Sequence, residues 1–297
     1  MIPKTLSLWF CAIPLMTLIG APVLAADVTV AQVARYEVPG YHCKWSPDGK
    51  QIGFTSKETG EPKIFVMPTE GGDAVLVESG LSGDHWFTWT PDSRSLVFDA
   101  YGPDGPPPRI WLIPVKGGTA QRLVPDIVPC FHPSISPDGE WLVFVSLRSG
   151  TSDIWKAKLN GDSLTQVTSN AGSNHHPQWS PDGTAILFAS DRGGNWDIWI
   201  ANADGSQTRQ LTDAAALDDQ PAASPDGKLV AFMSERSGKR DIWLVPIGDG
   251  PAQRITEEGR NSWPSFSPDG EHLLWSANRE GRTSLCIGKV SRDAATD

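Results

Sequence analysis

A short string, Ser-Pro-Asp-Gly, returns along this chain of 297 residues at a nearly constant interval. Copies begin at Ser46, Ser136, Ser180, Ser224 and Ser267, and the variant Thr-Pro-Asp-Ser at 90–93 fills the gap after the first. Successive copies begin 44, 46, 44, 44 and 43 residues apart. A period of about 40–45 residues with several short strands per repeat is typical of propeller blades. The repeat therefore predicts a ring of six blades.

Each unit shows the same order of strand signals. An alternating apolar strand follows the turn, as at 186–189, and a Gly-bearing hairpin comes next. A third strand opens with Asp-Ile-Trp, as at 197–199, and a fourth ends in Thr, as at Thr212. The pattern predicts an all-β fold built from four-stranded antiparallel blades.

The last unit has only three strand signals, because its third strand ends near Val290. The segment 33–38, ahead of the first unit, has the pattern of the missing fourth strand. Closing a propeller in this way removes exposed sheet edges. We therefore expect 33–38 to pair with the last unit, so that one six-bladed propeller occupies residues 26–297.

Charged residues recur in the hairpins of units three to five. Arginine stands five residues before the aspartate that opens the third strand, in the pairs Arg148 and Asp153, Arg192 and Asp197, and Arg236 and Asp241. Side chains that face each other across a hairpin form such pairs. We expect three ion pairs with a structural role.

Residues 1–25 have the features of an export signal. Lys4 precedes an apolar run that starts at Leu6, and the small residues before Ala26 suit cleavage after Ala25. We expect a periplasmic or secreted protein without stable membrane insertion after cleavage. A retained N-terminal anchor is the competing interpretation.

The net charge limits the classes of partner, and the number of cysteines limits the possible disulfides. The formal net charge is −10, which argues against nucleic acid and favours a basic partner. Outside the export signal the cysteines are Cys43, Cys130 and Cys286. Either two of them form a disulfide or all are buried thiols, and the sequence leaves both open.

The repeat resembles the TolB-type propeller family. Its pattern is clearest from His-Pro-x-Trp-Ser-Pro-Asp-Gly at 176–183 to Leu-Thr at 211–212, and the resemblance extends from about residue 33 to 290. It implies a periplasmic propeller that serves as a platform for protein binding. TolB proteins also carry an N-terminal α/β domain, for which we expect no room here, so a full Tol–Pal role is not implied.

One position of the repeat carries most of the candidate chemistry. It lies four residues before the Ser or Thr of each turn and is occupied by His42, Trp86, His132, His176, Gln220 and Trp263. Equivalent positions of successive blades form a ring around the axis. His42, His132, His176 and Gln220 are a ligand set that suits manganese or zinc. Asp84, Asp218 and Asp219 could add carboxylates, and a polar channel lining without metal is the alternative.

That ligand set also resembles the propeller oligogalacturonate lyases, which hold a metal with His and Gln ligands but have seven blades. Propellers of this type also occur in serine peptidases. Those need a Gly-x-Ser-x-Gly motif, which this chain lacks.

These observations predict a non-catalytic module that binds a protein or ligand at a funnel in the ring, with no catalytic residue and no cofactor assigned apart from the candidate divalent metal. The expected partner is an envelope or periplasmic protein, or a small ligand. The expected funnel mouth is Tyr41, His85, Trp86, His132, His175, His176 and Trp263. A metal-dependent lyase acting on acidic oligosaccharides is the alternative function. A purely structural propeller in an envelope assembly is the third.

Overall fold

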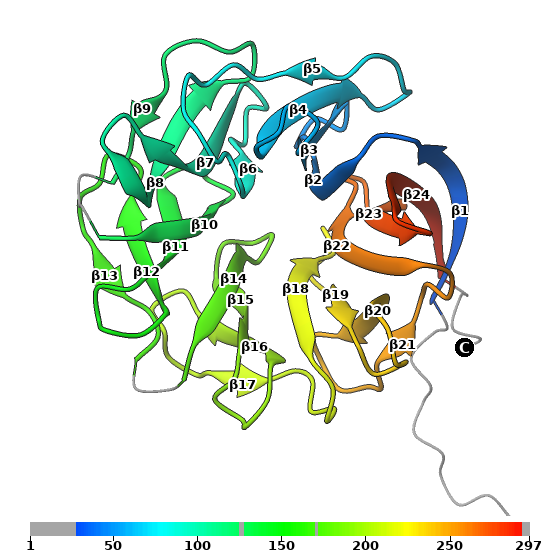
Figure 1. Cartoon of the computed structure of the whole chain (residues 1–297). Coiled ribbons are helices and arrows are strands. Elements are labelled where there is room, and N and C mark those ends of the chain that lie inside the picture. Colours follow the sequence, from blue (N-terminus) through cyan, green and yellow to red (C-terminus); the bar gives the residue numbers. More distant parts are fainter. Residues whose placement is uncertain (1–27, 125–127, 170–171, 293–297) are drawn as a thin grey trace, which may run out of the picture.

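The computed structural model describes residues 28–124, 128–169 and 172–292. Its 24 strands form six four-stranded antiparallel sheets, arranged as blades around a central axis (Figure 1). The predicted all-β, six-bladed propeller is thus confirmed. The predicted export signal at 1–25 lies outside the described residues. The described part of the chain contains no helix long and apolar enough to cross a membrane.

The blades follow one another along the chain. In blades 1 to 5 the strands succeed one another from the axis outward, whereas the outermost strand of blade 6 is the N-terminal strand of the chain. Blade 1 is β2 (Gly40–Trp45), β3 (Gln51–Ser56), β4 (Lys63–Pro68) and β5 (Val75–Leu76). Blade 2 is β6 (Phe87–Trp89), β7 (Ser95–Gly102), β8 (Gly105–Pro114) and β9 (Gln121–Arg122). Blade 3 is β10 (Cys130–Ile135), β11 (Trp141–Ser146), β12 (Asp153–Lys158) and β13 (Thr165–Gln166). Blade 4 is β14 (Asn174–Trp179), β15 (Ala185–Ser190), β16 (Asp197–Asn202) and β17 (Arg209–Gln210). Blade 5 is β18 (Asp218–Ala223), β19 (Leu229–Ser234), β20 (Asp241–Pro246) and β21 (Gln253–Arg254). Blade 6 is β22 (Arg260–Phe266), β23 (His272–Arg279), β24 (Arg282–Arg292) and β1 (Val28–Tyr36).

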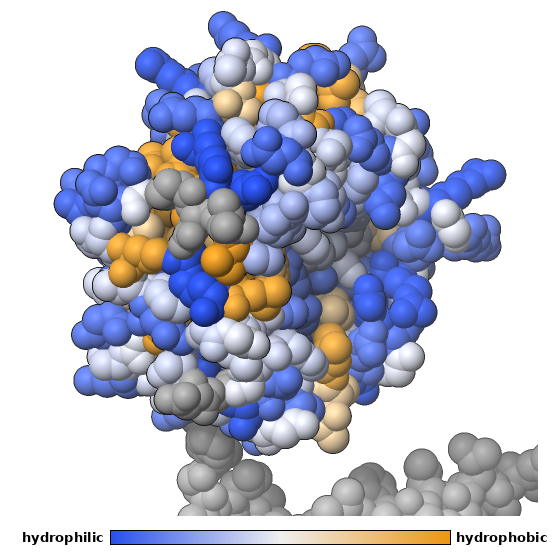
Figure 2. All heavy atoms as spheres, turned by 60° about the vertical axis from the view of Figure 1, so that its left-hand side comes forward, coloured by the Kyte–Doolittle hydropathy of each residue, from blue (hydrophilic) through white to orange (hydrophobic). Residues whose placement is uncertain are grey.

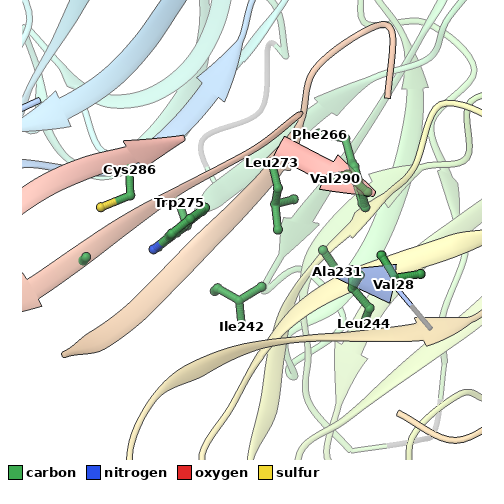
Figure 3. Packing of buried hydrophobic residues seen from close by; sticks show 10 residues of the cluster. Val28, Ala231, Ile242, Leu244, Phe266, Leu273, Trp275, Cys286 and Val290 are labelled. Carbon is green, nitrogen blue, oxygen red and sulfur yellow. The ribbon is translucent and has the colours of Figure 1, made fainter. Parts of the chain in front are cut away.

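The N-terminal strand closes the ring as predicted. β1 pairs antiparallel with β24, from Val28 opposite Arg292 to Tyr36 opposite Leu285. The strand is longer than the expected segment and begins earlier. Val28 packs against Ala231 and Leu244 of blade 5 (Figure 3), so the closing strand also joins two blades.

Apolar side chains between neighbouring blades form the core. Each of five second strands places a fully buried phenylalanine in it: Phe54, Phe98, Phe144, Phe188 and Phe232. The outer surface on the side of β8–β13 is mainly hydrophilic, with hydrophobic residues in small groups (Figure 2). Cys43, Cys130 and Cys286 are buried and form no disulfide with one another, and burial raises the pKa of Cys43.

The expected hairpin ion pairs of Arg192 and Arg236 are wrong, because each arginine bonds to a different partner, and no pair between Arg148 and Asp153 is present among the described residues. Arg236 Nη2 lies 2.5 Å from Asp218 Oδ2, and Arg192 donates to Asn174 Oδ1 at 2.8 Å. The guanidinium of Arg236 also covers the Trp243 ring at 4.8 Å, an arrangement that Arg148 and Arg192 share. The partner differs because the predicted aspartates point into the blade junctions instead.

Those junctions hold buried carboxylates. Asp241 accepts hydrogen bonds from Thr256 and, across the junction to blade 6, from Asn261 at 3.1 Å. Its other oxygen accepts from Ser237 and Arg254. Because these groups belong to different strands and blades, one carboxylate holds the junction together.

Candidate functional site

The repeat position singled out in the sequence does form a ring around the axis. His42, Trp86, His132, His176, Gln220 and Trp263 all line one cavity of about 470 Å³. The other lining residues follow these six in the innermost strands and reach the prolines of the Ser-Pro-Asp-Gly turns. The cavity therefore extends from the ring toward the end of the channel that carries those turns.

A backbone irregularity turns five of the six side chains inward. His42, His132, His176, Gln220 and Trp263 have left-handed φ angles between 46° and 59°, and the strand register shifts at each. Such β-bulges re-aim a side chain at the cost of backbone strain. The repeat thus contains a strained position at the channel in five blades.

Trp86 of blade 2 is the exception, and a buried carboxyl group supports it. Asp99 Oδ1, in β7, accepts the backbone N–H groups of Trp86 at 3.3 Å and His132 at 3.4 Å. Burial raises the pKa of Asp99 well above its usual range. Sequence reasoning missed Asp99; a carboxyl group within the apolar strand Leu-Val-Phe-Asp-Ala was the available signal.

Aromatic contacts join the ring residues. The imidazoles of His132 and His176 stack with centroids 4.1 Å apart, and Trp86 meets His132 edge-on at 4.1 Å. On the other side, His42 and His176 lie 4.9 and 5.1 Å from Trp263. The side chains therefore hold one another in place.

Burial keeps two of the histidines neutral. It lowers the pKa of His42 and of His132 well below the usual value, and nearby cations, including His176 when protonated, lower both further. His132 Nδ1 accepts the backbone N–H of His176 at 3.4 Å. His132 Nε2 and His42 Nδ1 are buried without a hydrogen-bond partner in the described part of the chain.

His176 has a carboxylate partner. Its Nδ1 lies 2.7 Å from Asp219 Oδ1, which also accepts the backbone N–H of Gln220. Burial acts to raise the pKa of Asp219, but His176 and the hydrogen bonds outweigh it and the pKa is lowered. This pair orients the ring and leaves His176 Nε2 buried without a partner among the residues described.

The candidate metal ligands share the ring without forming a closed cluster. Among the described residues, the one set of three His, Cys, Asp or Glu side chains with ligand atoms all within 4.8 Å is Asp269, Glu271 and His272, on a largely exposed turn. Gln220 Oε1 already accepts the backbone N–H of Trp263 at 2.8 Å. Metal binding by His42, His132, His176 and Gln220 stays a prediction.

The expected funnel mouth divides into two groups. Trp86, His132, His176 and Trp263 line the cavity, whereas Tyr41, His85 and His175 do not. The latter three stand one residue before a ring position, at the opposite end of the channel from the Ser-Pro-Asp-Gly turns. His85 stacks on Trp86 at 5.3 Å, and His175 lies 4.8 Å from Trp196. They remain candidates for the outer mouth.

Lys44 is a cavity residue that sequence reasoning missed. Its Nζ donates to Gln178 Oε1 at 3.1 Å, which joins blade 1 to blade 4 across the channel. Burial lowers the pKa of Lys44 to about 8, so the amine is mainly protonated at neutral pH. The available signal was a single Lys two residues after a ring position, where other blades have Thr88, Ser134 or Ala222.

Comparison with known families supports the fold. The family model described as the TolB beta propeller domain matches residues 88–207 and 126–296. An uncharacterized protein of Agrobacterium fabrum is 31% identical over 135 residues, which are 42% of each chain. The uncharacterized peptidase YuxL of Bacillus subtilis is 27% identical over 148 residues, or 38% of this chain. The chain thus spans only 42% and 22% of the length of these curated relatives.

Solved structures share the architecture at low sequence identity. An Agrobacterium tumefaciens protein provisionally called TolB is 22% identical with a TM-score of 0.72, over 92% of this chain and 99% of that one. TolB from Acinetobacter baumannii is 21% identical with a TM-score of 0.65, over 91% and 66%. An oligogalacturonate lyase from Vibrio parahaemolyticus is 16% identical with a TM-score of 0.57, over 89% and 98%. At these identities the likeness shows the fold alone.

Proposed function

This chain belongs to the TolB beta propeller domain family, and on that premise we propose that it is an exported, non-catalytic propeller that binds a partner through its central channel. One observation carries the proposal. Five of the six ring residues adopt strained left-handed φ angles that turn them toward the channel. Backbone strain of this kind persists only where the surrounding structure maintains it. It is found most often at binding and active sites.

The outer mouth suits a protein segment or an amphipathic ligand. Tyr41, His85 and His175 are half-buried, and each combines an aromatic face with a polar atom. Such side chains are favoured where two molecules meet. The net charge of −10 favours a partner with basic residues. The export signal at 1–25 supports an envelope or periplasmic partner.

Site-specific photo-crosslinking in the source cell tests this proposal. A photoreactive phenylalanine analogue at His175 should give one dominant adduct, and the same analogue at the exposed Lys116, in the turn between β8 and β9, should not. Trp86→Ala should reduce the yield of the adduct at His175, since Trp86 supports His85, another residue of the outer mouth. Equal labelling at both positions, or no adduct at His175, would overturn the proposal. N-terminal sequencing of the same material checks cleavage after Ala25.

A second candidate function, the metal-dependent lyase, is favoured by the pair of His176 and Asp219. A histidine oriented by a carboxylate, with its other nitrogen facing a cavity, is the arrangement of a general base or a metal ligand. Three buried histidine nitrogens without partners among the described residues are the right donors for manganese or zinc. The donors are not drawn together within ligand distance, so no reaction step follows from their arrangement.

Metal content separates the two functions. The mature protein, purified without a histidine tag, is compared with a His132→Ala/His176→Ala double variant. Nearly one manganese or zinc per chain, lost in the variant, would establish a metal site and lead to assays with acidic oligosaccharides. Metal at background level in a folded protein would rule out the hypothesis of a metal-dependent lyase.

A further inference from the structure

The cavity between the ring and the Ser-Pro-Asp-Gly turns differs in charge from the rest of the protein. No Asp, Glu or Arg lines it in the part of the chain that the structure describes, and Lys44 is the one lysine of that lining. The chain as a whole has an excess of acidic residues, with a net charge of −10. The charged side chain that lines the cavity is therefore basic, although the protein as a whole is acidic.

We propose that this cavity binds an organic carboxylate and that Lys44 is its counter-ion. The site lies on the far side of the ring from the outer mouth and uses Lys44, Gln178 and two serines. The inference goes beyond the proposed function, because it concerns other residues and holds whether or not a protein partner binds the mouth.

The partners of Lys44 leave it free to bind an anion. The side-chain partner of Lys44 Nζ is the amide oxygen of Gln178, at 3.1 Å, a neutral group. A carboxylate is a stronger acceptor for an ammonium than an amide oxygen. With its oxygen turned to Lys44, Gln178 also has its NH₂ group available to donate. Both residues line the cavity and meet from opposite blades, so an anion beside their contact can reach the ammonium of Lys44 and the NH₂ group of Gln178.

Two serines add donors to the same surface. Ser134 Oγ accepts the backbone N–H of Trp179, and Ser265 Oγ accepts that of Trp45, each at 3.4 Å. A hydroxyl that already accepts has its hydrogen left to donate. Ser134 and Ser265 line the cavity beside Lys44 and Gln178. The lining thus offers hydrogen-bond donors in excess, which is what a carboxylate requires.

The remaining wall suits the organic part of such a ligand. Trp45 and Trp179 come from the same innermost strands, and Pro47 and Pro137 stand at the turns where the cavity ends. A volume of about 470 Å³ lies within the range of small-molecule sites, roughly 300–1,000 Å³. An inorganic anion alone would leave this apolar wall uncovered.

Calorimetric titration with matched pairs of ligands tests the proposal. Acetate, hexanoate and benzoate are compared with acetamide, hexanamide and benzamide at neutral pH and fixed ionic strength, with the mature protein. At least one carboxylate should bind ten times more tightly than its amide. Binding should fall by a factor of ten or more in Lys44→Met and be unchanged in Lys50→Met, an exposed lysine with the same change of charge. If no carboxylate binds better than its amide, the proposal is wrong.

A second variant covers the case in which Lys44→Met does not fold. Gln178→Glu places a carboxylate against Lys44 within the protein and so supplies the charge that the ligand would bring. We expect this variant to fold and to lose carboxylate binding. Binding equal to wild type in Gln178→Glu would overturn the role of Lys44. Neither result depends on the photo-crosslinking at His175, so the two proposals fail separately.

Discussion

At the junction between blades 5 and 6, both oxygens of the buried Asp241 carboxylate are hydrogen-bonded, whereas in the channel three buried histidine nitrogens have no partner among the described residues. Buried polar groups are normally satisfied inside the protein because leaving them bare costs free energy. The junction between blades 5 and 6 follows that rule and serves stability. The channel departs from it in several blades at once, and this difference points to ligand binding in the channel.

The largest effect is expected from breaking the junction. Asp241→Ala removes the acceptor of Thr256, Asn261 and Arg254 and should lower the free energy of unfolding by about 3–5 kcal/mol. Urea unfolding followed by tryptophan fluorescence measures it. Asp249→Ala, at an exposed loop position, is the control and should leave the unfolding midpoint unchanged. A loss no larger than the control's would mean that the junction carboxylate contributes little.

A channel substitution should have a much smaller effect on stability. His132→Asn keeps a residue type that tolerates left-handed φ and removes a nitrogen that bonds to no described group. The loss of stacking on His176 should cost about 1 kcal/mol. The same urea experiment measures it. Destabilisation as large as that of Asp241→Ala would show that the ring is structural and would weaken the proposal of a binding channel.

The smallest effect compares two junctions through their pH dependence. At the junction of blades 4 and 5, Asp218 takes the place that Asn174 and Asn261 have elsewhere. Burial first, and then the charge of Asp218, raise the pKa of Asp197 to about 6. A raised pKa means that the folded state holds the proton more tightly, so this contribution to stability is present below about pH 4 and is lost as the pH rises through 6.

Asp218→Asn should therefore flatten that loss. Relative to wild type, the free energy of unfolding of the variant should rise between pH 4 and pH 7, by about 1 kcal/mol at most. Arg236 keeps an acceptor in the variant, as Arg192 does with Asn174. Urea unfolding at several pH values measures the difference. Parallel curves for the two proteins would show that Asp218 does not perturb Asp197.

Much of the fold could be predicted because the same pattern of turn and strand signals occurs six times in the sequence. Equal spacing of the Ser-Pro-Asp-Gly turns predicted the number of blades, and the missing last strand predicted the partner for β1. The same spacing placed His42, His132 and His176 on one ring. These inferences depend on register within a repeat, which the sequence contains directly.

The charge partners could not be predicted in this way. Arg236 and Asp241 are five residues apart across a hairpin, yet Arg236 pairs with Asp218 of the innermost strand. Asp241 is drawn instead to Thr256 and Asn261, one of them in the next blade. Spacing identifies which residues are near in the chain, and several of them compete for one partner.

The six blades, the closing strand and the ring position could be predicted from the amino-acid sequence, because each follows from a local pattern copied at a fixed period. The contact between Lys44 and Gln178, 134 residues away, is visible only in the folded ring. The same is true of the position of the cavity on one side of the ring. The physical reason is that these features depend on the width of the closed ring and on which side chains reach across it, and no single repeat encodes either.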